Sequence, residues 1–259
     1  MRIAPAFLLL LASLGCDSSE PPIQEDLDVV LATPKPACEA RSFEGTTFTV
    51  CPFSAAADRL ELIDGRNVRS FERLEASLGP RAAELRYAMN AGMYDENGAP
   101  IGLFVADGKE IKAINRREGS GNFHLMPNGV FAVAKDGKLS IAPTKAFKLR
   151  SPLWATQSGP MLLIGGKLHP KFDANGESQL IRNGVGVKDP QTAFFVISED
   201  PVSFGRFARF FRDALGASDA LYLDGSVSSL WDPGAGRQDA YSQLGPMVAV
   251  FRKQPSSAR

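Results

Sequence analysis

Apolar and polar residues alternate in short runs over most of the chain, and this period of two predicts β-strands. The alternation is clearest over 46–52 and 59–63. The apolar run over 220–223 has the length and composition of a buried strand. No repeat or shift in composition interrupts this pattern. We therefore expect one continuous domain over 38–254, followed by a short tail over 255–259.

Three dipeptides that contain glycine lie between apolar runs and predict tight turns. Asp107-Gly108 lies within the stretch 101–111, and Asp136-Gly137 lies within 130–141. A type I′ turn holds both of its central residues at positive φ, a conformation that favours Asp and Gly. We expect both stretches to be β-hairpins with this turn, and Gly165-Gly166 is a candidate for a third.

Two stretches show the helical period of about 3.6 residues instead. One helix is expected over 70–78, where the apolar residues fall on one face before Gly79-Pro80 ends it. A second is expected over 203–215, with phenylalanines at helical spacing and Gly216 as its C-terminal cap. Many strands with few helices predict a single α+β domain of mixed, largely antiparallel sheets with a few flanking helices.

The N-terminus has the pattern of an export signal. Arg2 precedes an apolar run that is too short to span a bilayer as a permanent helix. We interpret 1–15 as a signal peptide. Ser13-Leu14-Gly15-Cys16 resembles a bacterial lipobox, so we expect Cys16 to carry a lipid, with export without a lipid as the alternative. The polar, proline-containing segment 16–37 is typical of a disordered tether between a lipid and a folded domain.

Composition and charge limit the class of partner. The 259 residues include 29 basic and 29 acidic side chains. Proteins that bind nucleic acid usually carry a basic surplus that neutralises phosphates, so we expect no nucleic-acid partner. With 44% hydrophobic and 22% charged residues, the composition is that of a globular protein, not of a disordered or multi-span membrane protein.

The cysteines refine the expected location. Apart from Cys16, the chain has Cys38 and Cys51, thirteen positions apart. In an oxidising compartment such a pair can form a disulfide worth about 3 kcal/mol in the chain-entropy account. Two unpaired buried thiols are the alternative, and no further cysteine pair or His-x-x-x-His motif supports a zinc site. We expect an exported protein, periplasmic or at the cell surface, that contacts the membrane only through its N-terminal lipid.

Several common catalytic motifs are absent from the sequence, among them Gly-x-Ser-x-Gly, Ser-x-x-Lys, His-Glu-x-x-His and the Walker loop. His124 and His169 are the only histidines. Two histidines offer few candidates for a Ser-His-Asp triad or a histidine-rich metal site. We therefore expect no metal and no other cofactor.

Polar residues gather where apolar strands end. Loops at strand ends commonly hold catalytic groups, and their glycines let a substrate approach the backbone closely. The segment with the clearest chemistry is Leu223-Asp224-Gly225-Ser226, which places an acid directly after a buried strand. Asp224-Gly225 taken alone is equally compatible with one more hairpin turn.

In their order along the chain, these polar segments resemble the phosphodiester glycosidase family, most closely its exported bacterial branch. The resemblance covers about 86–250. It rests on Asn90-Ala91-Gly92-Met93-Tyr94, Gly121-Asn122-Phe123-His124 with Pro127-Asn128-Gly129-Val130-Phe131, Ala155-Thr156-Gln157-Ser158-Gly159-Pro160, Arg182-Asn183-Gly184-Val185-Gly186 and Leu223-Asp224-Gly225-Ser226. The sequence departs from the family pattern at Ala91, where glycine is usual, and over 226–228, where a glycine-rich run is usual.

The resemblance implies hydrolysis of the bond between a sugar anomeric carbon and a phosphodiester oxygen, which releases a sugar and a phosphomonoester. Phosphate leaves as a stabilised anion, so a cation and a carboxylate matter more than a strong general acid. We expect Arg182 to grip phosphate with two prongs, Asp224 to act as nucleophile or as base for water, and His124 to donate a proton or bind phosphate. Neutral hydrogen bonds to the substrate are expected from Asn90, Asn122, Gln157, Ser158, Asn183 and Ser226.

Two other functions remain open at this stage. Asp224, Asn90 and His124 are candidates for holding a divalent ion in a metal-dependent phosphodiesterase of the cell envelope that cuts the P–O bond. A lipoprotein that binds glycans without turnover is the other. In each case the expected partner is a carbohydrate phosphodiester or a glycan.

Overall fold

The computed structural model describes Met1 and residues 35–148 and 150–253. All of the predicted signal peptide 1–15 except Met1, the predicted lipidation site Cys16 and the tail 255–259 lie outside these residues, as does the predicted tether 16–37 up to residue 34. The described residues of 35–253 belong to one compact unit.

Three antiparallel sheets make up the body, which confirms the expected α+β fold class. The seven-stranded sheet has the spatial order β1 (Glu39–Phe43), β2 (Thr46–Ser54), β13 (Thr192–Ser198), β12 (Asn183–Asp189), β14 (Asp219–Asp224), β10 (Met161–Ile164) and β11 (Lys167–Leu168). The β4 sheet has the order β16 (Arg237–Gln238), β15 (Leu230–Asp232), β4 (Leu85–Asn90), β17 (Met247–Arg252) and β3 (Asp58–Ile63). The β9 sheet has the order β6 (Lys109–Lys112), β5 (Phe104–Ala106), β9 (Trp154–Ser158), β7 (Gly129–Val133) and β8 (Leu139–Pro143).

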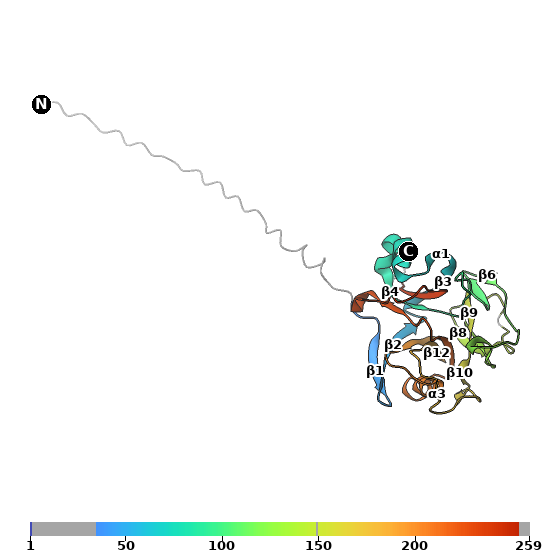
Figure 1. Ribbon diagram of the computed structural model, residues 1–259. Coiled ribbons are helices and arrows are strands. Elements are labelled where there is room, and N and C mark those ends of the chain that lie inside the picture. The colour runs from blue at the N-terminus through green and yellow to red at the C-terminus, as the bar shows by residue number, and fades with distance from the viewer. Residues whose placement is uncertain (2–34, 149, 254–259) are drawn as a thin grey trace. The chain divides into compact units, whose positions relative to one another are not determined.

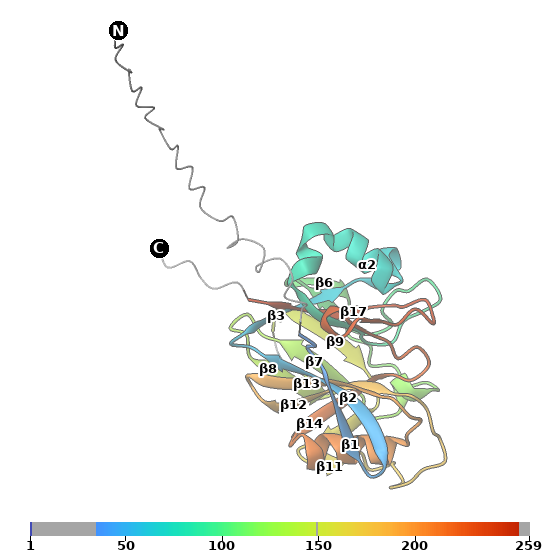
Figure 2. The same cartoon turned by 90° about the vertical axis from the view of Figure 1, so that its left-hand side faces the viewer.

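The helices are few and short. They are α1 (Gly65–Val68), α2 (Phe71–Leu78), α3 (Phe204–Arg209), the 3₁₀ turns Gly79–Glu84, Asn122–His124 and Pro233–Ala235, and the π turn Phe210–Ala214. Helices α1 and α2 lie at one end of the body and α3 lies at the other (Figure 1, Figure 2).

Both predicted helices are present. Ser70 caps α2, since its side chain accepts a hydrogen bond from the Arg73 N–H. Ser203 caps α3 in the same way, but the expected helix changes to a π turn for its last residues. Gly216 follows at a φ of 67°, the left-handed conformation that favours glycine.

Two of the three predicted turns have the expected geometry. Both residues have positive φ in Asp107-Gly108, at 50° and 73°, and in Gly165-Gly166, at 53° and 76°. The expected type I′ turn at Asp136-Gly137 is wrong, because only Gly137 has positive φ. The loop there is longer by one residue, and the Ala134 N–H donates to the Lys138 carbonyl.

One hydrophobic core is shared by the inner faces of the three sheets, with contributions from Phe53, Tyr87, Phe131, Phe195 and Leu221 among others. A second cluster packs α3 and the π turn against the outer face of the seven-stranded sheet. The third covers the β4 sheet with α2. Each sheet is therefore fixed on at least one face, and the ends of its strands are held in place.

The predicted disulfide is confirmed between Cys38 and Cys51. Glu39 pairs with Val50 in the ladder of β1 and β2, so the two cysteines stand opposite each other, with Cα atoms 4.2 Å apart. Asp232 holds the same segment, because its carboxylate accepts hydrogen bonds from the N–H groups of Ala37 and Cys38.

The chain crosses between two sheets directly after Asp224. Strand β14 belongs to the seven-stranded sheet, whereas the next strand, β15, pairs with β4. Asp224-Gly225 is therefore not a hairpin turn, and that alternative is wrong. Residues 225–229 form a connecting loop, which we call the Asp224 loop.

Candidate active site

Asp224 ends β14 as a buried carboxylate, with 8% of the residue exposed. Its Oδ1 atom accepts hydrogen bonds from the backbone N–H groups of Gly225 at 2.6 Å and Ser226 at 2.8 Å. Burial raises the pKa of Asp224 above its ordinary value, and the amides of Ser226, Gly225 and Val227 oppose that rise. The loop thus orients the carboxylate with dipoles and places no full positive charge against it.

Asn90 at the end of β4 and Asn183 at the start of β12 join two sheets beside Asp224. The Asn183 amide donates to the Asn90 carbonyl at 2.8 Å and to the Asn90 Oδ1 at 3.1 Å. That Oδ1 also accepts from the Ser229 N–H at 2.8 Å. Both asparagines are almost fully buried. They therefore hold the far end of the Asp224 loop.

Two serine hydroxyls tie the neighbouring backbone together. Ser228 Oγ lies 3.2 Å from the Asp224 carbonyl oxygen and 3.3 Å from Asn183 Oδ1. Ser158, at the end of β9, donates to the Leu223 carbonyl at 3.0 Å. The predicted residues Asn90, Ser158, Asn183 and Ser226 are thus all brought to the end of β14. Ser226 reaches Asp224 through its backbone N–H.

Arg182 is fully buried behind this cluster. Its Nε donates to the Val202 carbonyl at 2.8 Å and its Nη2 to the Ser178 carbonyl at 2.9 Å, while the guanidinium lies 3.7 Å from the Phe204 ring centre. Burial lowers its pKa, and the phenol of Tyr222 opposes that shift. Within the described residues, Nη1 makes no hydrogen bond of ordinary geometry.

The expected two-pronged grip of Arg182 on phosphate is therefore not available in this structure. A bidentate contact needs two parallel N–H groups, and Nε and Nη2 already donate to internal carbonyls. The remaining nitrogen, Nη1, is buried, and the Tyr222 ring centre is 5.4 Å from the guanidinium carbon.

Tyr222 connects the buried cation to the carboxylate. Burial raises the pKa of its phenol; the charge of Arg182 and a hydrogen bond with Asn122 lower it, and the charge of Asp224 raises it. A side chain at Gly225 would collide with the Tyr222 hydroxyl, so glycine is required at that position. The phenol therefore lies among Arg182, Asn122 and the Asp224 loop.

His124 lies on the same 3₁₀ turn as Asn122 but faces its own loop. Its Nδ1 is 2.9 Å from the Arg117 carbonyl oxygen, and its ring packs edge-on against Phe123. Because a carbonyl only accepts, Nδ1 carries the proton and Nε2 is the nitrogen that can meet a ligand. Asn122 joins the cluster through its hydrogen bond with Tyr222. The hydrogen bond and the ring contact of His124 are instead with Arg117 and Phe123.

Gln157 points to the opposite face of β9 from Ser158. Its Oε1 accepts from the N–H groups of Leu103 at 2.9 Å and Asn115 at 2.8 Å. Its Nε2 donates to the Asn115 carbonyl at 2.6 Å and to Thr144 Oγ1 at 3.2 Å. These bonds use the full capacity of the amide. We therefore assign Gln157 to holding these loops and not to the substrate.

Sequence reasoning missed four residues of the cluster: Tyr94, Tyr222, Ser228 and Ser229. Tyr222 lies two residues before Asp224 in β14, but the register against β12 shifts between them, so simple alternation does not predict how the two side chains lie. Tyr94 is half-buried; burial and the charge of Asp224 both raise the pKa of its phenol. Its hydroxyl donates to the Gln243 carbonyl at 2.7 Å, a contact from a distant loop that no local pattern reveals.

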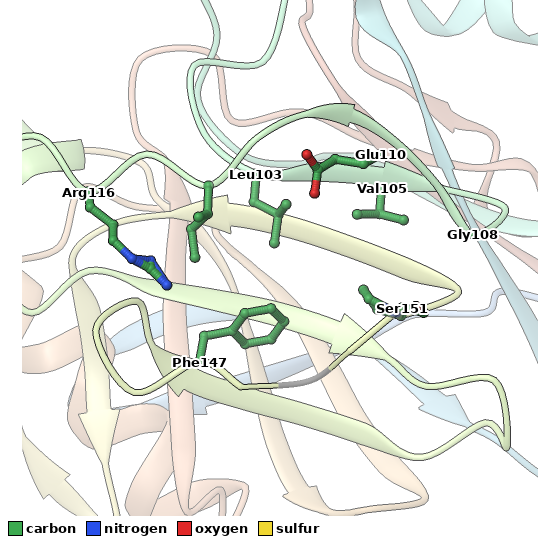
Figure 3. Close-up of a pocket in the computed structure, with 9 residues that line it drawn as sticks. Leu103, Val105, Gly108, Glu110, Arg116, Phe147 and Ser151 are labelled. Carbon is green, nitrogen blue, oxygen red and sulfur yellow. The ribbon is translucent and has the colours of Figure 1, made fainter.

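Two pockets differ in their relation to this cluster. One, of about 390 Å³, lies against the Asp224 loop. Another, of about 270 Å³, lies on the β9 sheet, where Leu103, Val105 and Phe147 form its apolar lining beside Glu110 and Arg116 (Figure 3). The second pocket contains none of the predicted site residues.

Over 35–148 and 150–253, no three His, Cys, Asp or Glu side chains group as a metal site would need. Within the same ranges, no helix has the length and hydropathy to cross a membrane.

Comparisons with known proteins agree with the resemblance. The profile of the phosphodiester glycosidase family matches residues 83–242. The chain is 38% identical to the uncharacterized protein YigE of Escherichia coli (strain K12) over 171 residues, which cover 66% of this chain and 67% of that protein.

Two solved structures share the fold. The zebrafish N-acetylglucosamine-1-phosphodiester alpha-N-acetylglucosaminidase catalytic domain, auto-inhibited by its pro-peptide, aligns with a TM-score of 0.58 at 13% identity, over 84% of this chain and 82% of that one. A hypothetical protein from Synechocystis aligns with a TM-score of 0.51 at 14% identity, over 83% of this chain and 61% of that one. Since the family profile spans more than half of the sequence, this chain belongs to the phosphodiester glycosidase family and is a hydrolase of that class.

Proposed function

We propose that this hydrolase cleaves the glycosidic C–O bond of a sugar-1-phosphodiester and releases a free sugar and a phosphomonoester. The observation that carries the proposal is the convergence of a buried carboxylate, Asp224, and a buried cation, Arg182, on one phenol, that of Tyr222. A reaction that develops positive charge at carbon and negative charge on phosphate needs both signs of charge at one site.

Asp224 serves the anomeric carbon. It either attacks that carbon or takes a proton from the attacking water, and the bond from carbon to the phosphodiester oxygen breaks with its electron pair on the phosphate. Because the phosphate leaves as a stabilised anion, it needs no strong acid. The configuration of the released sugar distinguishes the two roles, since direct attack retains it and base catalysis inverts it.

Arg182 acts from behind Tyr222. Its charge is enclosed by the Phe204 and Tyr222 rings, where low polarity strengthens its field at the leaving phosphate. The Asn122 amide, which is partly exposed, is the group we place against phosphate oxygens, and the buried Tyr222 hydroxyl interacts with it from the inner side. His124 lies two residues after Asn122 on the same turn, and its Nε2 is available for one further hydrogen bond to the substrate. Asn90, Asn183 and Ser158 position the Asp224 loop.

The protein is proposed to work outside the cytoplasm. The Cys38–Cys51 disulfide supports this, because disulfides persist in oxidising compartments. Anchoring through a lipid on Cys16 is part of the same proposal and rests on the sequence pattern alone.

The test is turnover of a panel of sugar-1-phosphodiesters in ¹⁸O-labelled water, with chelator present and absent. We expect a phosphomonoester free of label, because water attacks carbon. Label in the phosphomonoester would show P–O cleavage and overturn the proposal in favour of the phosphodiesterase alternative. Glycan binding with no turnover of any member of the panel would overturn it in favour of a binding protein.

A further inference from the structure

The pocket of about 390 Å³ beside the Asp224 loop has no assigned role. All five residues of the loop, 225–229, line it. The remaining lining comes from Ile181, Ile197, Ser198, Glu199, Arg237, Asp239, Tyr241 and Ser242. A ligand in this pocket therefore touches the residues that directly follow Asp224.

The charges in the pocket are already paired. Arg237 donates to Glu199 at 2.6 Å and to Asp239 at 3.0 Å. Glu199 and Asp239 carry two negative charges and Arg237 one positive charge, which leaves a net charge of −1 for these three groups. Such a pocket disfavours phosphate and other anions. It suits a neutral ligand.

The pocket also presents unusual apolar surface. Apart from Met1, only Leu180, Ile181 and Tyr241 are large hydrophobic residues that are well exposed within the described part of the chain. Two of them line this pocket: Ile181 is 43% exposed and Tyr241 is 86% exposed. An aromatic ring beside several hydroxyls matches a ligand with apolar faces and polar edges.

The loop that carries Tyr241 is fixed at both ends. Before it, the Asp239 carboxylate accepts from the Leu230 N–H at 2.9 Å. After it, the Leu244 N–H donates to the Arg69 carbonyl at 2.8 Å, and the Tyr94 hydroxyl donates to the Gln243 carbonyl. These anchors hold the chain on both sides of Tyr241, whose ring lines the pocket.

We propose that this pocket binds the sugar of the substrate as a neutral pyranose ring, with Tyr241 and Ile181 against its apolar face. The hydroxyls of Ser226, Ser228 and Ser242 supply hydrogen bonds to the ring hydroxyls. The phosphate then lies on the Tyr222 side of Asp224, and the loop separates the neutral half of the substrate from its charged half. The catalytic part of this inference rests on the proposed function, while the binding of a sugar does not.

The test measures binding without turnover. Glucose, N-acetylglucosamine, glucuronate and inorganic phosphate are titrated separately into the wild type, Tyr241→Ala, Tyr241→Phe and Leu180→Ala proteins and followed by NMR. Leu180→Ala is the matched control, because it removes an exposed apolar side chain next to the pocket but outside its lining. We expect Tyr241→Ala to weaken binding of one or both neutral sugars about fivefold to tenfold, the size of an aromatic contact. Tyr241→Phe retains most of the affinity.

Glucuronate is expected to bind more weakly than glucose, and Tyr241→Ala is expected to leave phosphate binding unchanged. The inference would be overturned if Tyr241→Ala and Leu180→Ala changed the sugar affinity equally, or if Tyr241→Ala left the sugar affinity unchanged. Either result would count against the pocket even where wild-type protein hydrolyses phosphodiesters. Sugar binding that depends on Tyr241 in a protein that hydrolyses none of them supports the pocket and refutes the proposed function instead.

Discussion

At the scale of single residues, the site combines a carboxylate and a cation that are both removed from water. Asp224 is held by backbone N–H groups and Arg182 by backbone carbonyls, so neither charge is cancelled by a direct ion pair in the described contacts. Buried charges without a pair cost stability, and proteins retain them where chemistry requires them.

The first prediction concerns Asp224→Asn. The amide oxygen keeps the acceptor for the loop N–H groups but cannot attack carbon or take a proton, so we expect kcat to fall about 10²–10⁴-fold, the range for losing a catalytic acid or base. The free energy of unfolding should stay equal or rise, because burial disfavours the ionised form. Asp232→Asn, at another buried carboxylate, is the control expected to keep kcat. Unchanged turnover by folded Asp224→Asn would remove Asp224 from the chemistry.

The pH profile tests the state in which Asp224 works. As nucleophile or base it must be ionised, so activity is lost as pH falls through its pKa. Burial raises that pKa, so we expect the acid limb of kcat/KM above about 3.9, the ordinary value for Asp. Tyr94 and Tyr222, whose phenols feel the charge of Asp224, stay protonated there, since the ordinary pKa of a phenol is about 10 and burial raises both values further. A profile that instead loses activity as pH rises through this range would make Asp224 a general acid.

Tyr222→Phe tests the phenol as the link to phosphate. The variant removes one hydroxyl and keeps the buried ring, and a hydrogen bond of about 0.5–1.5 kcal/mol corresponds to a loss of about twofold to tenfold in kcat. The loss should be larger for a phosphodiester than for a glycoside without phosphate. Tyr87→Phe is the matched control, a buried phenol whose hydroxyl lies 3.3 Å from the Cys51 carbonyl oxygen in the core. An equal loss on both substrates would contradict the role.

At the scale of elements, the local patterns predicted strands, turns and helices because their causes are local. Asp107-Gly108 forms a two-residue turn between the paired residues Ala106 and Lys109, and Ser70 caps α2 through a residue three positions away. The choice of partner strand is not local. Asp224-Gly225 has the composition of a turn, yet β15 pairs with β4 instead of β14. The strands before and after this dipeptide pack in two different sheets, and that packing involves residues far away in the sequence.

The same limit applies to the site. Asn90, Ser158, Asn183 and Asp224 all lie at ends of strands, and in the structure they lie close together. Which way a side chain points depends on contacts with distant residues. Gln157 and Ser158 are neighbours on opposite faces of β9. Gln157 forms hydrogen bonds with loops of the β9 sheet, whereas Ser158 donates a hydrogen bond to the Leu223 carbonyl in the site.

The joint between β4 and β12 makes its own prediction. Asn90→Ala leaves the buried Ser229 N–H without an acceptor, and Asn183→Ala leaves the Asn90 oxygens short of a donor. We expect each change to lower the free energy of unfolding by about 1–3 kcal/mol in urea titrations. The double variant should lose less than the sum, because both residues share the same bonds. Exposed Asn97→Ala is the control, and strictly additive losses would show that the two do not act as one unit.

At the scale of the whole molecule, the disulfide lies in a different region from the active site. The disulfide fixes β1 to β2 at one edge of the seven-stranded sheet, and β13 and β12 stand between β2 and β14. The active-site loop is held from the other side by β4 and by the Asn90–Asn183 pair. Loss of the disulfide should therefore lower the free energy of unfolding without rearranging the site.

Reduction of Cys38–Cys51 tests this separation. We expect the reduced protein to lose about 3 kcal/mol of unfolding free energy, because a cross-link of this loop length mainly restricts the unfolded chain. Below its unfolding transition, the reduced protein should keep kcat and KM within twofold, since the β1–β2 ladder and the Asp232 contacts to Ala37 and Cys38 still position the edge. The measurement pairs urea unfolding with kinetics, before and after a phosphine reductant, and Cys38→Ala with and without reductant is the control for side effects. A fall in kcat that tracks reduction while the protein remains folded would show that the edge strand and the active site are coupled through the sheet.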